Sequence, residues 1–184
     1  MQWNIPGTVL TVPLEKAGQA EEKLISMFLG GGMVLSQVAA VTGLEPYTVQ
    51  NWVKRGFLTK PIGKKYTLRQ LCRILNINML KDALPMEDIC GLLTYINGHL
   101  DDESDDLIDD SKLYFLFLQV AAYHRQMKDQ GGRDQFIRQQ LENYREPIPG
   151  ARERVEKVLQ VMLTAWAAAL LRQQATAMVS ELKK

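Results

Sequence analysis

The stretch from Leu35 to Leu58, LSQVAAVTGLEPYTVQNWVKRGFL, predicts two short helices joined by a tight turn. Apolar or small residues recur at i, i+3, i+4 and i+7 in the first helix, on one helical face; they are Leu35, Val38, Ala39 and Thr42. Gly43 follows, where the end of a helix favours a residue that adopts a positive φ. Pro46 suits the first position of the second helix, because its missing N–H would have no partner there. Gly56 is expected to end that helix.

The second helix has an apolar face and an opposite polar face. Val49, Trp52 and Val53 share the face that we expect to be buried. The outward face carries an aromatic ring, two amides and a cation, namely Tyr47, Gln50, Asn51 and Lys54. Gln and Asn pair with adenine in the major groove, and Lys reaches guanine or phosphate. The pattern predicts a helix-turn-helix; an ordinary helical hairpin with a solvated face is the alternative.

The residues after this helix favour nucleic-acid binding. The segment Thr59 to Tyr66, TKPIGKKY, combines a Pro/Gly turn with paired lysines, as a wing beside a reading helix does. Between Glu45 and Arg73 there are seven cations against that single acid: Lys54, Arg55, Lys60, Lys64, Lys65, Arg69 and Arg73. The net charge of the chain is only +1. Such local clustering is the electrostatic signature of phosphate binding.

The stretch Thr42 to Leu58 resembles the start of a MerR-type DNA-binding domain. The matching positions are Thr42, Gly43, Pro46, Thr48, Arg55, Gly56 and Leu58. Departures are Glu45 for the usual Ser, Asn51 for a Tyr and Val53 for an acid, so no base preference is implied. The resemblance implies a winged helix-turn-helix that binds double-stranded DNA as a dimer. The candidate DNA contacts are Tyr47, Thr48, Gln50, Asn51, Lys54, Arg55, Lys64, Lys65 and Tyr66.

Roughly residues 33 to 115 also resemble the bacterial family called domain of unknown function 1836. This resemblance implies a DNA-binding regulator with an acidic segment and a helical tail. We therefore expect a mostly helical, all-α protein in four parts. They are an N-terminal segment and helix (1–32), the MerR-like domain (33–98), an acidic linker (99–112) and a C-terminal helical packing or dimerisation region (113–184).

The parts outside the predicted DNA-binding domain give weaker signals. Residues 1 to 13 read as short and irregular. The acidic run HLDDESDDLIDDSK (99–112) lacks the spacing of a calcium-binding loop. It is expected to be a solvated linker, with docking on the basic wing as the alternative. Ser111 is expected to cap the apolar helix that follows, from Leu113 to Met127.

The last helix, from Ala151 almost to the C-terminus, carries a heptad-like stripe: Val155, Leu159, Met162, Trp166 and Ala169. The stripe fits packing within the chain or a dimer seam, and we expect a homodimer through the C-terminal helices. A further alternative is that the C-terminal region binds an unidentified small-molecule effector. The side chains that would surround it are Tyr114, Phe117, Tyr123, Met162 and Trp166, although aromatic residues and Met at helical spacing are usually part of the core.

Composition and motifs narrow the function classes. With 46% hydrophobic and 23% charged residues the chain is ordinary for a globular protein, and no run is long enough for a membrane span. Two cysteines, Cys72 and Cys90, without a CxxC motif, indicate a reducing cytoplasm and no disulfide. No catalytic, metal or cofactor motif is visible, so we expect no enzyme, metal site or cofactor. The alternative to a regulator is a protein–protein interaction module with a helix-turn-helix shape that does not bind DNA.

Overall fold

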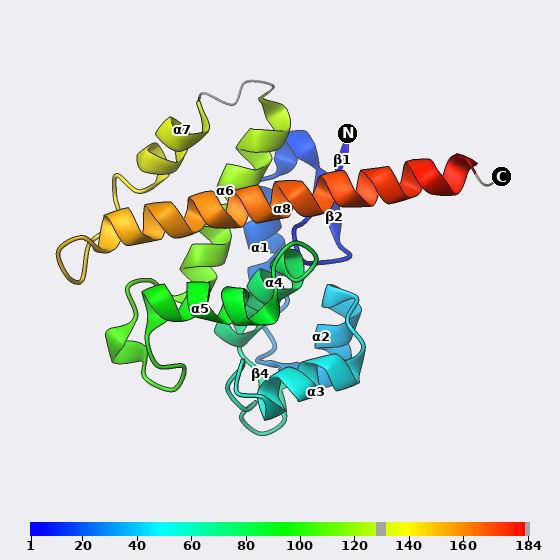
Figure 1. Ribbon diagram of the computed structural model, residues 1–184. Helices are drawn as coiled ribbons and strands as arrows, with labels where there is room; N and C mark the ends of the chain where they lie inside the picture. The colour runs from blue at the N-terminus through cyan, green and yellow to red at the C-terminus, as the bar shows by residue number, and fades with distance from the viewer. Residues whose placement is uncertain (128–131, 183–184) are drawn as a thin grey trace.

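A computed structural model describes residues 1–127 and 132–182, and it is mostly helical, which confirms the class expected from the sequence (Figure 1). Four short strands form two antiparallel pairs, β1 with β2 and β3 with β4. The elements in chain order are β1 (Gln2–Asn4), β2 (Thr11–Pro13), the 3-10 helix η1 (Leu14–Lys16), α1 (Gln19–Ser26), β3 (Met33–Val34), α2 (Leu35–Thr42), α3 (Pro46–Lys54), β4 (Lys65–Tyr66), α4 (Leu68–Leu80), α5 (Met86–Asn97), the 3-10 helix η2 (Glu103–Asp105), α6 (Asp110–Gln126), α7 (Arg133–Gln140) and α8 (Ala151–Leu182).

Helix α4 lies at the centre of the fold and is buried on nearly all sides. It begins with the predicted capping box, in which the Thr67 hydroxyl accepts from the Gln70 amide and the Gln70 side chain accepts from the Thr67 amide. Its main partner is α6, with α5 and α8 packed beside it. One continuous cluster of buried side chains runs from Trp3 to Trp166. The four segments expected along the chain therefore share one core.

The helices α2 and α3 form as the sequence predicts. Gly43 ends α2 with φ of 71°, and Pro46 is the first residue of α3. Val49 and Trp52 lie on the inner face of α3 and are buried. Glu45 stands at the N-cap position but makes no side-chain cap, so its carboxylate does not replace the hydroxyl of a Ser.

The N-terminus is a β-hairpin, whereas the sequence suggested an irregular segment. Trp3 pairs with Val12 across β1 and β2, and Ile5 is fully buried. The hairpin is held by the core helices: the Tyr114 hydroxyl donates to the Pro6 carbonyl at 2.7 Å, and the Asn78 side chain donates to the Gly7 carbonyl at 2.8 Å. These long-range bonds fix the hairpin against the core.

Helix α6 begins earlier than expected, because Asp109 rather than Ser111 is its N-cap. The Asp109 carboxylate accepts from the backbone amides of Ser111 at 2.8 Å and Lys112 at 3.3 Å. A carboxylate at this end also suits the positive end of the helix dipole. Asp110 thereby enters the first turn of α6 and is buried against α4.

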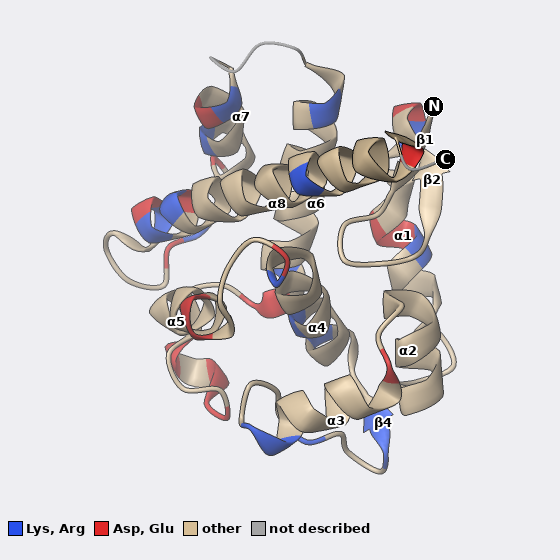
Figure 2. Ribbon diagram, turned by 45° about the vertical axis from the view of Figure 1, so that its right-hand side comes forward, with Lys and Arg blue, Asp and Glu red and all other residues tan. Residues whose placement is uncertain are grey.

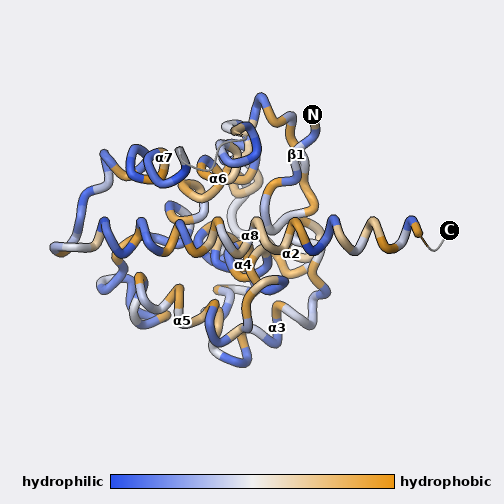
Figure 3. Tube along the Cα trace, turned by 45° about the horizontal axis from the view of Figure 1, so that its top comes forward, coloured by the Kyte–Doolittle hydropathy of each residue, from blue (hydrophilic) through white to orange (hydrophobic). Residues whose placement is uncertain are grey.

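Helix α8 crosses the whole molecule, and its C-terminal part extends past the other elements (Figures 1 and 3). The predicted heptad-like stripe is buried within the chain, on the face of α8 that packs on α4, α5, α6 and α7. All residues from 171 to 182 are exposed. The stripe therefore packs in the core of the chain, and a different face of α8 is exposed to solvent.

In the described residues, no helix combines the length and the apolar character needed to cross a membrane. Both cysteines are free thiols; Cys72 is buried in α4, and Cys90 is half-buried in α5. Burial raises the pKa of the Cys72 thiol, which keeps it protonated and unreactive.

Close contact between the N-terminal hairpin and α4 predicts that Gly7→Ala destabilises the protein. Gly7 has φ of 75°, and an added Cβ would lie 2.6 Å from the Leu75 carbonyl oxygen. A strained backbone conformation alone costs about 1–3 kcal/mol, and the clash adds to it. Urea unfolding should show a loss of this size for Gly7→Ala and almost none for Gly30→Ala, where nothing lies within 4 Å. Equal stability of the two variants would show that the hairpin does not dock as described.

Candidate nucleic-acid interface

The polar face of α3, which we call the α3 face, consists of Tyr47, Gln50, Asn51 and Lys54. All four side chains are exposed, and Tyr47 is 70% exposed. The helix is anchored from behind by buried Val49 and Trp52. The exposed tyrosine, two amides and lysine point away from the core, so the face is free to contact another molecule.

Two predicted contact residues are placed differently. The Thr48 side chain is half-buried, and the Tyr66 side chain is only 3% exposed. Burial raises the pKa of the Tyr66 phenol. The Tyr66 side chain packs in the core beneath the β3–β4 pair, so we remove it from the set of contact residues.

The segment 59–66, which we call the 59–66 loop, forms a tight hairpin. Ile62 and Lys65 exchange both backbone hydrogen bonds, at 3.1 Å and 2.9 Å. Gly63 and Lys64 between them have φ of 55° and 63°, as a two-residue type I′ turn requires. The turn displays Lys64 and Lys65 to solvent together with Ile62, which is 79% exposed. Sequence reasoning missed Ile62, although a large apolar residue beside a Gly-Lys turn is a signal for an exposed tip.

Side chains from α4 fix this loop to the core. The Gln70 side-chain nitrogen donates to the Thr59 hydroxyl at 2.8 Å and to the Lys60 carbonyl at 3.0 Å. Arg73 donates through Nε to the Phe57 carbonyl at 3.0 Å. Gln70 and Arg73 therefore hold the chain immediately after α3 and set where the loop stands relative to the α3 face.

The acidic segment, residues 101–110, is only in part the solvated linker that the sequence favoured: residues 101–105 are exposed, and residues 106–110 are half-buried or buried. It folds back onto two arginines of α4. Arg69 lies 2.6 Å from Asp106 and 3.0 Å from Glu103, and Arg73 lies 3.4 Å from buried Asp110. The segment thus docks within the chain, on α4 rather than on the lysines of the 59–66 loop.

This docking corrects the predicted basic cluster. Arg69 and Arg73 serve the acidic segment and cannot also contact phosphates. The cations that stay exposed are Lys54, Arg55, Lys60, Lys64 and Lys65. Within the described parts of the chain none of these five has an ion-pair partner, and the Arg55 guanidinium stacks on the Phe57 ring at 4.6 Å. Figure 2 shows positive charge beyond the C-terminal end of α3 and on β4, with acids gathered around η2 and the start of α5.

The buried acids of this cluster have raised pKa values. Burial raises the pKa of Asp106 to about 6, against the opposing pull of Arg69. Burial also raises the pKa of Asp110, with Arg73 and Arg69 opposing it. Both carboxylates are ion-paired to arginines, so burial raises their pKa values while the pairing lowers them.

Among residues 1–127 and 132–182, no three His, Cys, Asp or Glu side chains are arranged to hold a metal ion.

Comparison with known proteins gives a family match that covers α2, α3, the 59–66 loop and the acidic segment. Residues 33–117 match the family described as Domain of unknown function (DUF1836), which confirms that resemblance; the match covers less than half of the chain. Over 84 residues the chain is 32% identical to the "Uncharacterized protein YkrK" of Bacillus subtilis (strain 168), which is 44% of this chain and 36% of that protein. The chain therefore spans about a third of the length of that relative. No solved structure matches the chain.

The matched stretch runs from β3 through α2, α3, the 59–66 loop, α4, α5 and the acidic segment into α6. It includes both Arg69 and Arg73 and their acidic partners. The stretch that matches the family therefore contains both the α3 face and the ion pairs between α4 and the acidic segment.

The buried Arg73–Asp110 pair predicts a large stability loss when one partner is removed. Arg73→Met leaves buried Asp110 with Arg69 alone, 3.7 Å away, and also removes the bond to Phe57, so the free energy of unfolding should fall by up to roughly 3–5 kcal/mol. Chemical denaturation measures the loss. Lys157→Met, which breaks the exposed Lys157–Glu153 pair, is the control and should change little. The double variant Arg73→Met/Asp110→Leu should recover part of the loss, and failure to lose stability in Arg73→Met would refute the pairing.

Proposed function

We propose that this protein is a sequence-specific DNA-binding protein, a transcriptional regulator that reads DNA with the α3 face. The observation that supports this most directly is the exposed polar face of α3 with unpaired cations beyond its end and on the neighbouring loop. On this proposal the α2–α3 pair is a helix-turn-helix and the 59–66 loop is its wing, as the MerR resemblance implies. An α-helix with exposed amides fits the major groove.

The residue roles follow from their positions. Tyr47, Gln50 and Asn51 would face base edges, since they lie in the exposed first two turns of α3. The phosphate contacts would come from both sides of α3, from Lys54, Arg55, Lys60, Lys64 and Lys65. Because acids of residues 101–110 neutralise Arg69 and Arg73, positive charge is concentrated at the proposed contact surface. Phosphate contacts supply affinity that falls with salt, while base contacts supply sequence preference.

Separate substitutions should divide these roles. Lys65→Ala should weaken binding to matched and scrambled duplexes alike and reduce the slope of log affinity against log salt by about one per protomer. Gln50→Ala should cost about 1–3 kcal/mol on the selected site and less on scrambled DNA. The measurement is fluorescence anisotropy after selection from random duplexes, with Lys16→Ala, an exposed lysine of η1, as the control. If the Gln50 and Lys65 variants behave alike on both duplexes, the division of roles is wrong. No binding by the wild type at low salt would refute DNA binding itself.

We also propose that the protein acts as a homodimer through the open face of α8. The exposed positions Leu171, Ala175, Met178 and Leu182 are spaced by four, three and four residues, which is a heptad pattern. Val161 continues the same pattern toward the core and is 42% exposed. A helical end of this length is marginal in water when it stands alone. Pairing with a second copy would bury this stripe and bring two α3 faces to paired half-sites.

Substitution on this stripe tests the dimer. Met178→Glu should shift sedimentation velocity from dimer to monomer, because it would place like charges opposite each other in the paired stripe. Ser180→Glu, on the other side of the same helix, adds the same charge and should leave the dimer intact. A wild-type protein that sediments as a monomer at every accessible concentration would contradict the proposal.

The open end of α8 also supports the alternative that the protein is an interaction module that does not bind DNA. In that case a partner protein would cover the stripe, and the five exposed cations would have no phosphate partner. Failure of DNA selection together with loss of partner binding in Met178→Glu would favour this alternative.

A further inference from the structure

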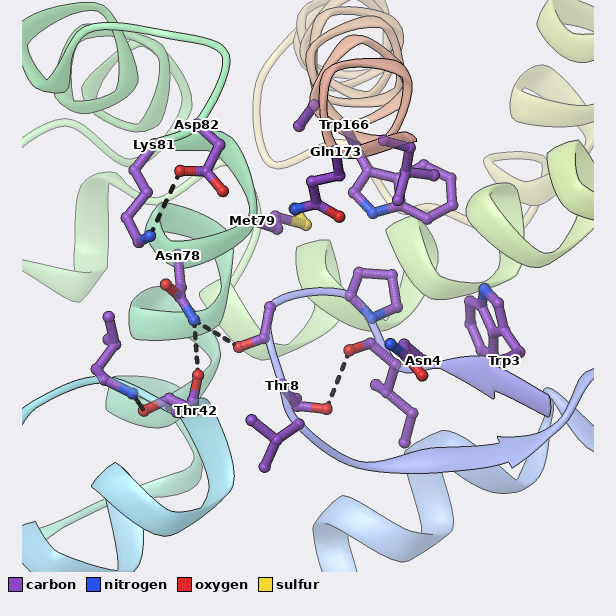
Figure 4. Close-up of a pocket in the computed structure, with 18 of the residues that line it drawn as sticks. Trp3, Asn4, Thr8, Thr42, Asn78, Met79, Lys81, Asp82, Trp166 and Gln173 are labelled. Atoms are coloured by element: carbon purple, nitrogen blue, oxygen red, sulfur yellow. Dashed lines mark hydrogen bonds and ion pairs between the residues drawn. The ribbon is translucent and has the colours of Figure 1, made fainter. Parts of the chain in front are cut away.

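A cavity of about 500 Å³ lies where the N-terminal hairpin, the end of α2, the end of α4 and α8 meet (Figure 4). Small-molecule sites usually have volumes of roughly 300–1,000 Å³. The aromatic residues expected to surround an effector are instead filled core: Tyr114 and Phe117 are fully buried. Of that set, Trp166 also lines this cavity.

One residue that lines the cavity carries a buried hydrogen-bond donor that no described residue accepts. Trp3 lines it and is only 4% exposed, and its buried indole Nε1–H has no hydrogen-bond partner among residues 1–127 and 132–182. A buried donor without a partner is costly and uncommon in native proteins. In Figure 4 the Gln173 amide comes from α8 and points toward the hairpin, beside the indole ring of Trp166. These groups surround a space that a polar molecule would fill.

The charge around the cavity is positive. Asp82 is the one acid among the described residues that line it, and it is already ion-paired with Lys81 at 3.6 Å and Arg172 at 3.2 Å. Arg125 lines the cavity from α6, is exposed, and within the described residues forms no ion pair. An exposed guanidinium and an unpartnered indole N–H on residues that line one cavity favour an anionic acceptor, and the guanidinium fork matches the two oxygens of a carboxylate.

We propose that this cavity binds a small organic carboxylate. Arg125 would hold the carboxylate, and the apolar body of the ligand would lie against Trp166, Met79 and Leu170, which also line the cavity. The ligand would sit beside Thr42, Gly43 and Leu44, the turn that leads into α3. Binding at this site does not depend on the proposed function, and its test uses no DNA.

The first test uses benzoate as the probe and benzamide, which has nearly the same shape without the charge, as the matched compound. Isothermal calorimetry measures both on the full chain. Tryptophan fluorescence reports the location, because two of the three tryptophans line the cavity. Benzoate should bind at least about tenfold more tightly than benzamide, as expected for the loss of a charge-assisted contact. Equal affinity for the two compounds, or no binding of benzoate, would overturn the proposal.

Two substitutions then test the residues. Arg125→Gln should weaken benzoate binding by about tenfold or more. Gln173→Glu should weaken it as well, by adding a negative charge to the lining of the cavity. Both residues are exposed, so folding should be retained, which circular dichroism checks. Lys16→Gln removes a positive charge outside the cavity and is the control. Benzoate binding that is unchanged in Arg125→Gln, or reduced equally in Lys16→Gln, would show that no specific carboxylate site exists here.

Discussion

Helix α4 is buried on almost all sides, so hydrogen-bond partners for its polar side chains must come from inside the protein, and among the described residues only the Asn76 side-chain oxygen on this helix is buried without one. Gln70 meets this need at the 59–66 loop, Arg73 at Phe57 and Asp110, and Asn78 at the carbonyls of Gly7 and Thr42. Every one of these partners lies in a loop or at the end of a helix. The helix therefore organises the segments that have no regular structure of their own.

This arrangement fixes α3 from both ends. Asn78 holds the Thr42 carbonyl, just before the turn that leads into α3, and Arg73 and Gln70 hold the chain just after it. Between these anchors Trp52 packs downward and the α3 face stays in solvent. On the proposed function, a helix held in this way would lose little conformational freedom on binding DNA, which would lower the entropic cost of binding.

Local signals made part of this structure predictable, and long-range pairing hid the rest. Gly43, Pro46 and the Thr67–Gln70 capping box act over a few residues, so the helices α2, α3 and α4 could be placed from the sequence. The partners of Arg69 and Arg73 lie 37 residues away in the chain, and no periodicity reports them. The N-terminal hairpin had a local signal, the alternation of Trp3 with Ile5 and of Leu10 with Val12 around Gly7, but its order depends on bonds from Asn78 and Tyr114. The stripe on α8 was visible, yet spacing alone cannot tell a core face from a dimer seam.

The acidic segment explains how a chain with a net charge of +1 carries a positive surface. Four acids, Glu103, Asp106, Asp109 and Asp110, lie against Arg69, and Asp110 also contacts Arg73. These ion pairs neutralise positive charge at α4, and the lysines of the 59–66 loop have no ion-pair partner in the part of the chain that the structure describes. Screening at physiological salt limits interactions between exposed charges to about 8 Å, so the potential near α3 depends on this local distribution and hardly on the total. Net charge is therefore a poor guide to what this surface attracts, and the ion pairs within the chain decide which cations remain available.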